Sequence, residues 1–570
     1  MPARASRSDE PSTPSGDHLI SRSAAVQLIL VGALLVSVGV VPVSVVATPE
    51  AAHPTQSSQA AETANASTPR IAVVFPDPIA ANDSGEYVVV ETAGAPNLTL
   101  EDGESIVKVP ADGRAALSSS PNATRALVEG RVTSPGLDLS NAGERLVLRQ
   151  GGVVVDRVHY ARAREGKRLN ATTDRWTPRG LQPRRVVSTG AATATAFVLP
   201  DAPQVAIETL RSAETRILLA GYTFASSRMT DALLAANRRG VSVRVLLEGG
   251  PIGGMTTAQR AQLDRLVAGG VEVRVIDGPH ARFTYHHAKY AVVDDQALVL
   301  TENWKPAGTG GHDSRGWGVR VDSTTTAAEL ADVFAHDANW MDAVPWRAAR
   351  RNATFVEAGP ASGSYDSDFD PARVEIERIR LLTAPENAGT AVRQTIHEAD
   401  NRVWVLSPRL DAEGPYFASL VDAARRGVRV RILLSNAWYD AESNRAVVER
   451  TATLRERGVP IEARIARPVG RFGKVHAKGA IVDGDTVLIG SLNWNQGAER
   501  RNREVVLALS GSEPAAYYGQ TFDADWNRAG ESAGPVRSIT DRRVQVTMVL
   551  GALAALMLAG VVLRQVIEFE

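Results

Sequence analysis

The 570-residue chain contains no cysteine. Disulfides, thiolate metal ligands and a cysteine nucleophile are therefore excluded, although either redox compartment is compatible with this absence. No His-Glu-x-x-His zinc pattern, Walker A loop or Gly-x-Gly-x-x-Gly turn occurs in it. Charge of one sign is not in excess either, because the formal net charge is −1. No global electrostatic field would therefore attract the chain to nucleic acid or to anionic lipid.

Lysine is scarce, with six lysines against 57 arginines. Yet a His-x-Lys-x4-Asp pattern occurs twice, once from His287 through Lys289 to Asp294 and again from His476. The second copy continues through Lys478 and Asp483. With so few lysines, two chance matches are improbable. We expect the two segments to meet in one active site.

Each His-Lys pair lies in an apolar run that favours a β-strand, over residues 285–293 and 475–482. Residues i and i+2 of a strand face the same side, so the histidine and the lysine of each pair should project together. A neutral imidazole is a nucleophile and an acid or base, and an ammonium group suits phosphoryl oxygens. One pair alone favours a structural histidine beside a solvated lysine, whereas two matching pairs favour catalysis. His286 should point to the opposite face, as a structural residue.

The residues after the second pattern extend it. Ser491 and Asn493 lie in Gly-Ser-Leu-Asn-Trp and could donate hydrogen bonds to a phosphate, and Glu504 could orient an imidazole. The whole pattern, His-x-Lys-x4-Asp-x6-Gly-Ser-x-Asn, resembles the phospholipase D superfamily. The resemblance covers about residues 196–530, and the second copy follows the pattern without a break.

The first copy departs from this pattern. Thr301-Glu302-Asn303-Trp304 stands where Gly-Ser-x-Asn-Trp is expected, and the interval from aspartate to asparagine is one residue shorter. We expect Glu302 to replace or displace the serine, and Gly316 to stand at the position of Glu504. A carboxylate near a phosphate site is unfavourable unless it turns away or is protonated, so no role is predicted for Glu302.

The resemblance implies a two-step displacement without a metal or other cofactor. One histidine attacks phosphorus to give a phosphohistidine, and the other protonates the leaving alcohol and then activates water or a second alcohol. In most two-copy relatives the N-terminal histidine is the nucleophile, which implies His287 here. The resemblance assigns catalysis to His287, Lys289, His476 and Lys478, and supporting or phosphate-binding roles to Asp294, Asn303, Asp483, Ser491, Asn493 and Glu504. The two aspartates should support the local fold rather than react.

The chain from about residue 196 alternates strands with helices in two copies. A strand, a helix with a basic end and a following glycine, and a second strand recur in each copy. This alternation predicts a duplicated α/β body with parallel pairing through right-handed crossovers. The repeats should span 196–355 and 370–530. The expected strands are 215–222 and 241–247 in the first copy, and 402–407 and 428–434 in the second.

Residues 70–180 show short β-type runs separated by turn signals, which predict a β-sandwich. The domain resembles a lamin-tail-type immunoglobulin-like domain in three segments, Gly85–Val88, Leu139–Arg145 and Val155–Val158. No catalytic constellation is visible there, so a spacer or binding module is expected. The preceding residues, 50–69, are rich in Ala, Ser, Thr and Pro and predict a disordered stalk.

Two uncharged apolar runs are typical of membrane segments. Residues 1–49 read either as a cleaved signal peptide or as an N-terminal anchor, and residues 544–563 read as a C-terminal transmembrane helix. Three arginines precede the first run and none follows it until Arg70, so the body should lie outside the cytoplasm.

These observations predict a membrane-anchored phospholipase D-like phosphodiesterase or phosphatidyltransferase acting on phospholipid headgroups. Two alternatives stay open. An anchored extracytoplasmic nuclease of the same superfamily would bind nucleic acid through local basic patches. A surface binding or scaffold protein would carry a decayed site, as the altered first copy could suggest. Protein partners are not predicted.

Overall fold

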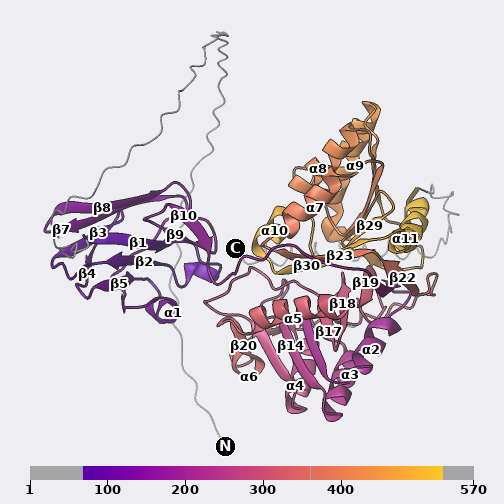
Figure 1. The fold of residues 1–570 in the computed structure, drawn as a ribbon, viewed down its shortest axis with the longest axis horizontal. Coiled ribbons are helices and arrows are strands. Elements are labelled where there is room, and N and C mark those ends of the chain that lie inside the picture. The colour runs from indigo at the N-terminus through magenta and orange to yellow at the C-terminus, as the bar shows by residue number, and fades with distance from the viewer. Residues whose placement is uncertain (1–67, 360, 531–570) are drawn as a thin grey trace, which may run out of the picture. The chain divides into compact units, whose positions relative to one another are not determined.

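The computed structural model describes residues 68–359 and 361–530 (Figure 1). Both segments expected at a membrane, 1–49 and 544–563, lie outside the described residues, as does nearly all of the expected stalk. Within the described ranges, no helix has the length and apolar character needed to cross a membrane.

Two β-sheets form the N-terminal domain. Val88 and Val90 of one sheet and Leu100 and Leu148 of the other share one buried core, so the sheets pack face to face as a sandwich. The assignment to the lamin-tail type stays a prediction. In sheet order, the first contains β10 (Arg175–Pro178), β9 (Lys167–Asn170), β1 (Arg70–Phe75), β2 (Tyr87–Glu91), β5 (Arg114–Leu117) and β6 (Arg131–Thr133), and the second contains β4 (Ile106–Val109), β3 (Leu98–Glu101), β7 (Glu144–Gln150) and β8 (Val153–Tyr160).

The body that follows consists of two copies of one α/β unit with the same strand order. The first sheet runs β20 (Ala343–Pro345), β16 (Glu272–Ile276), β14 (Ser242–Glu248), β13 (Arg216–Gly221), β17 (Tyr290–Val293), β18 (Gln296–Leu300), β19 (Ser314–Asp322), β12 (Ala192–Leu199) and β22 (Ala372–Ile376). The second runs β26 (Ile461–Ile465), β25 (Arg429–Leu434), β24 (Arg402–Ser407), β28 (Gly479–Val482), β29 (Thr486–Gly490), β30 (Glu504–Ser510), β23 (Arg378–Ala384) and β11 (Val187–Thr189).

The expectation of parallel pairing holds for only part of each sheet. Three strands of each copy are parallel, β13, β14 and β16 in the first and β24, β25 and β26 in the second. The strands that carry the site are antiparallel, because the hairpin turn at Asp294 and Asp295 joins β17 directly to β18. A tight hairpin joins only antiparallel strands, whereas a parallel pair needs a long crossover. Each sheet is therefore mixed.

Helices cover the outer face of each sheet, and the inner faces share a core (Figure 1). That central core contains Val292 and Val319 from the first copy together with Ile481 and Leu507 from the second. Two long helices, α5 (Thr324–Ala338) and α11 (Ser512–Gly530), contribute to the same core. The outer helices are α2 (Gln204–Arg211), α3 (Ser227–Arg238) and α4 (Thr257–Ala268) in the first copy and α7 (Ala388–His397), α8 (Pro415–Arg425) and α9 (Ala441–Glu456) in the second.

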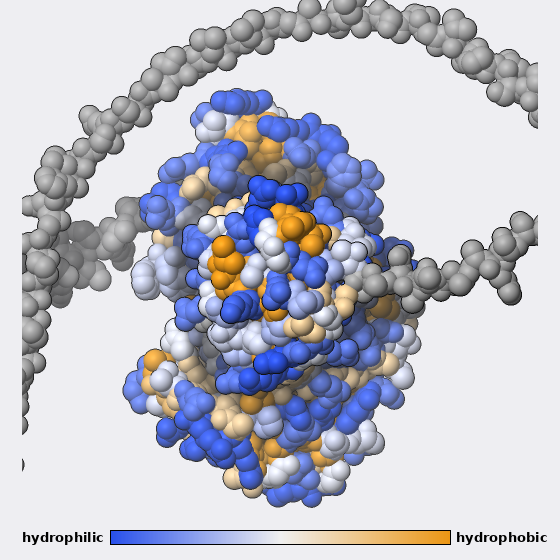
Figure 2. All heavy atoms as spheres, turned by 90° about the vertical axis from the view of Figure 1, so that its left-hand side faces the viewer, coloured by the Kyte–Doolittle hydropathy of each residue, from blue (hydrophilic) through white to orange (hydrophobic). Residues whose placement is uncertain are grey.

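The face of the molecule drawn in Figure 2 is mostly hydrophilic, with small separate hydrophobic patches. Two large apolar side chains of the body are nonetheless strongly exposed. Ile252, in the loop after β14, is 76% exposed, and Trp438, in the short helix η2 (Trp438–Asp440) after β25, is 86% exposed. The two loops follow equivalent strands of the two copies.

Candidate active site

The His-Lys pairs lie immediately before β17 and β28 and not inside them, so the strands are shorter than predicted. The reason is that the histidine backbones pair with the opposite copy. The backbone N–H of His287 donates to the carbonyl oxygen of Arg503 at 2.9 Å, and that of His476 donates to the carbonyl oxygen of Arg315 at 2.9 Å. Each copy therefore holds the histidine of the other.

The first histidine is paired with a carboxylate from the second copy. Nδ1 of His287 lies 2.9 Å from both oxygens of Glu504, at the start of β30. Glu504 is fully buried, and Nδ2 of Asn502 donates to its Oε1 at 3.1 Å. This pair fixes the imidazole plane and leaves Nε2 as the ring atom not held by the carboxylate.

The second histidine is paired with a carboxylate from the first copy. Nδ1 of His476 lies 3.1 Å from Oε2 of Glu302, and its Nε2 lies 3.2 Å from Nζ of Lys478. The sequence assigned no role to Glu302, whose partner is 174 positions away. The two crossed contacts bring both patterns into one site.

Burial sets the protonation of both histidines. It lowers the pKa of His287 to about 4 and the pKa of His476 to about 3. Burial alone would raise the pKa of the partner carboxylates, but the nearby histidines and lysines lower the pKa of both Glu302 and Glu504. Both imidazoles are therefore neutral at pH 7 beside ionised carboxylates. Since a carboxylate only accepts, each Nδ1 carries the proton and each Nε2 carries a lone pair.

The two motif lysines are buried with them. Nζ of Lys289 donates to the carbonyl oxygen of His287 at 2.5 Å, and Nζ of Lys478 donates to that of His476 at 2.6 Å. Burial lowers the pKa of Lys478 to about 8 and that of Lys289 well below its usual value. The ring of Tyr222 lies against both His287, at 4.8 Å between centroids, and Nζ of Lys289, at 5.3 Å. No motif in the sequence pointed to Tyr222 as a residue of the site.

The motif aspartates bind the backbone of their own copy. Asp294 accepts hydrogen bonds from the backbone N–H groups of residues 214–216, and Asp483 accepts from those of residues 400–402. Burial alone would raise the pKa of Asp294, but a hydrogen bond from the Thr215 hydroxyl, together with these backbone bonds, lowers it to about 2. Both carboxylates join the hairpin to the start of the neighbouring strand and face away from the histidines.

The hydroxyl positions of the two copies are equivalent. Oγ of Ser491 accepts from the backbone N–H of Val505 at 3.0 Å, and Oγ1 of Thr301 accepts from that of Trp317 at 2.9 Å. Thr301 therefore stands where Ser491 stands, and the expectation that Glu302 replaces the serine is wrong. The first copy is one residue shorter than the second in the hairpin before Thr301. The residues after that hairpin therefore keep equivalent positions in the two copies. Ser491 also lies 3.4 Å from the carbonyl oxygen of Val505, and its phosphate-binding role stays a prediction.

The two asparagines follow these hydroxyls. Asn303 is 6% exposed, and its Oδ1 has no hydrogen-bond partner among the described residues. Asn493 is less buried. Their backbone carbonyls make the same turn, since that of Asn303 accepts from Lys305 at 2.9 Å and that of Asn493 accepts from Asn495 at 2.8 Å.

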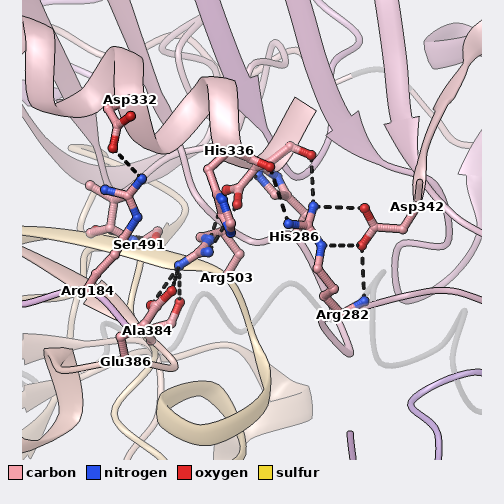
Figure 3. Close-up of polar contacts among 12 residues, drawn as sticks. Arg184, Arg282, His286, Asp332, His336, Asp342, Ala384, Glu386, Ser491 and Arg503 are labelled. Atoms are coloured by element: carbon pink, nitrogen blue, oxygen red, sulfur yellow. Dashed lines mark hydrogen bonds and ion pairs between the residues drawn. The ribbon is translucent and has the colours of Figure 1, made fainter. Parts of the chain in front are cut away.

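A buried arginine next to each carboxylate position ties the two copies together. Arg503 forms ion pairs with Asp337 of α5, at 2.9 Å, and with Glu386, at 2.7 Å (Figure 3). Arg315 forms the equivalent pairs with Asp525 of α11, at 2.9 Å, and with Asp201. Both side chains are fully buried. The sequence reasoning missed this pair, whose only signal was an arginine before Gly316 and before Glu504.

His286 belongs to the Arg503 network and not to the reactive pair. Its backbone N–H donates to Glu248 at 2.6 Å, and its Nε2 lies 3.5 Å from Asp337. The side chain is fully buried. The His286 side chain therefore packs behind the site, on the opposite face from His287, as the alternation of side chains along a strand predicted. Across the described ranges, no group of three or more His, Asp or Glu side chains could hold a metal ion.

This geometry defines a class of duplicated α/β proteins with one histidine and one lysine from each copy in a shared site. A family model described as cardiolipin synthase, phospholipase D-like domain, matches residues 206–338 and 392–526. By this match the two segments are phospholipase D-like domains.

Two similar proteins each match only part of the chain. A mitochondrial cardiolipin hydrolase of Xenopus tropicalis is 36% identical over 101 residues, which are 18% of this chain and 43% of that protein. Cardiolipin synthase A of Pseudomonas entomophila is 29% identical over 155 residues, 27% of this chain and 31% of that protein. The chain thus spans less than half the length of either relative.

Two solved structures match parts of the chain at low sequence identity. Phosphatidylserine synthase from Haemophilus influenzae is 13% identical with a TM-score of 0.45, and the match covers 61% of this chain and 86% of that one. A phospholipase D family member, Nuc, from Salmonella typhimurium is 20% identical with a TM-score of 0.23, covering 28% of this chain and 98% of that one.

Proposed function

We propose that the chain is a phosphodiesterase or phosphatidyltransferase that acts on phospholipid headgroups through a phosphohistidine intermediate. The observation that carries this proposal is the crossed pair of neutral imidazoles, each with its Nδ1 on a buried carboxylate and a motif lysine beside it. A decayed site would have no need to keep two buried lysines and two buried carboxylates, whose desolvation is costly.

In the first step, Nε2 of His287 forms a bond to phosphorus while the bond from phosphorus to the headgroup oxygen breaks. The departing oxygen takes a proton from Nε2 of His476, which the negative charge of the bound phosphodiester favours in its protonated form. The ammonium groups of Lys289 and Lys478 hold the phosphoryl oxygens. In the second step, water or an alcohol gives its proton to His476, attacks phosphorus and releases His287.

Phospholipid is the substrate class that the surroundings of the site support. The matched relatives are named for cardiolipin. In addition, the backbone N–H of the exposed Ile252 donates at 2.6 Å to the hydroxyl of Tyr222, whose ring touches His287. The exposed Trp438 packs on Tyr439, whose ring lies 5.6 Å from Nζ of Lys474, two residues before His476. Apolar side chains beside the site suit a lipid surface better than a nucleic-acid backbone.

Anchoring completes the proposal. The apolar runs 1–49 and 544–563 would hold the body outside the cytoplasm, close to the headgroups that it uses. The β-sandwich would then act as a spacer or as a binding module for a surface partner.

The test uses the full-length chain in detergent and EDTA, offered phosphatidylglycerol vesicles and, separately, single- and double-stranded DNA. We expect glycerol release from the lipid, with phosphatidic acid as the hydrolysis product or cardiolipin as the transfer product. His287→Ala and His476→Ala should each abolish release, whereas His159→Ala, on the exposed side of β8, should not change it. Cleavage of DNA alone would establish the nuclease instead, and inactivity on every substrate would support the scaffold reading.

A further inference from the structure

The carboxylates that hold the two histidines come from different positions in the two copies. Leu300 pairs with Gly318, and Gly490 pairs with Val506, which places the two hairpins in the same register. Counting along each strand from these pairs, Gly316 stands at the position of Glu504, and Glu302 stands at the position of Leu492. The first copy thus has its carboxylate at the end of β18, and the second has it at the start of β30.

Glu302 occupies a core position. Leu492 is 1% exposed and belongs to the apolar core of the second copy, and Glu302 is equally buried at 1%. A buried carboxylate in place of a leucine is destabilising unless it is paired and hydrogen-bonded. Its hydrogen bond to Nδ1 of His476 is therefore the interaction that accounts for its presence.

Gly316 provides the space that Glu302 needs. A Cβ atom added at Gly316 would lie 2.3 Å from Cγ and 2.6 Å from Oε1 of Glu302, far inside van der Waals contact. Gly316 is not among the glycines with a positive φ, so its backbone conformation does not itself require glycine. The residues at 302 and 316 are therefore matched. Position 316 lacks the carboxylate that Glu504 provides in the second copy, and Glu302 provides it from the neighbouring strand.

We infer that Glu302 is the positioning residue of His476, and that the first copy keeps a working site because its carboxylate has moved from position 316 to position 302. The inference rests on the proposed function for its kinetic consequence but not for its geometry. Glu302 holds the proton on Nδ1 and aims Nε2 into the site, as Glu504 does for His287. The departure from the family pattern in the first copy is thus a compensated one.

The kinetic test moves the carboxylate back. In the full-length chain, Glu302→Leu should lower kcat for glycerol release about 10- to 100-fold with KM changed less than about twofold, the effect of losing a partner that orients a histidine. The double variant Glu302→Leu/Gly316→Glu, which copies the second repeat, should recover kcat to within about tenfold of the parent. Gly316→Glu alone should be inactive, since two side chains would occupy one space.

A spectroscopic readout separates this inference from the proposed function. The chain has only ten histidines, so selective 15N labelling should resolve a downfield ring N–H signal that His476→Ala removes. Glu302→Gln should shift this signal and leave that of His287 in place, Glu504→Gln should do the reverse, and the double variant should restore it. If the parent releases no glycerol but the signals respond in this way, the proposed function fails, and Glu302 still stands as the residue that positions His476. A double variant that melts like the parent, yet lacks both the activity and the signal, would overturn the inference.

Discussion

At the scale of single residues, four of the six lysines lie in or close to the candidate site. Of the six lysines in the chain, Lys289 and Lys478 are the motif residues, Lys305 lowers the pKa of Glu302, and Lys474 forms an ion pair with Asp313 at 3.3 Å. Arginine is used almost everywhere else. A lysine loses its proton much more readily than an arginine when it is buried, so these positions can change charge where an arginine could not.

The buried Lys478 should therefore give the enzyme an alkaline limit. Because burial lowers the pKa of Lys478 to about 8, its ammonium is lost as pH rises above that value, and the phosphoryl oxygens lose a positive partner. We expect kcat/KM for glycerol release to fall about tenfold per pH unit between about pH 8.5 and 10. Lys478→Arg should lower the rate and make this fall shallower, because a guanidinium stays charged while the buried Lys289 can still lose its proton. A parent profile that is flat up to pH 10 would contradict the assignment.

At the scale of elements, the loops after β14 and β25 present apolar side chains beside the site. Ile252 and Trp438 are the most exposed large apolar residues of the described body. Full burial of one such side chain contributes roughly 1.5–3 kcal/mol, which corresponds to a tenfold or greater change in partition. The two loops come from equivalent places in the two copies, so each copy contributes one of the two exposed apolar side chains.

Removing these side chains should separate lipid docking from chemistry. The variant Ile252→Ser/Trp438→Ser should sediment with phosphatidylglycerol vesicles about 100-fold more weakly, because each side chain contributes about tenfold, and its activity on vesicles should fall in proportion. Activity on a short-chain, monomeric phosphatidylglycerol should stay within about twofold, because neither side chain touches the reacting groups. Met341→Ser, 40% exposed and outside these two loops, is the matched control. Equal losses on both substrates would rule out a docking role.

The sequence could predict the elements and a role for Glu504 in orienting an imidazole, but not the contact between Glu302 and His476. Arg402–Ser407 is a strand at the predicted bounds, and Gly240 and Gly427 take the left-handed conformation expected after their helices. The His-Lys pairs needed only local spacing. The link from Glu302 to His476 depends on how two sheets pack, and no local periodicity carries that information. Thr301 was misplaced for a related reason, because the one-residue difference lies in a hairpin that only the register reveals.

At the scale of the whole molecule, two buried arginines brace one copy against the other. Arg315 reaches from β19 to Asp525 of α11, and Arg503, the residue before β30, reaches to Asp337 of α5. The backbone carbonyl of each arginine also holds the histidine of the opposite copy. The stability of the body and the geometry of the site therefore depend on the same residues.

Breaking one brace should destabilise the body as a whole. Arg503→Met leaves Asp337 and Glu386 buried without their partner, which should cost about 3–5 kcal/mol of unfolding free energy. Arg500→Met, at a side chain that is 65% exposed, should change it by less than about 0.5 kcal/mol. Urea unfolding of the full-length chain followed by tryptophan fluorescence measures both. Equal stability of the two variants would show that the brace is dispensable.

The crossed contacts between histidine and carboxylate also have a hereditary consequence. A mutation that removes Glu504 harms the histidine encoded in the first half of the gene, and one that removes Glu302 harms the histidine encoded in the second. An intact copy therefore cannot rescue a damaged one, as a spare duplicate would. Natural selection acts on the two halves as a single inherited unit, and the duplication, once crossed in this way, can no longer be undone by losing either half.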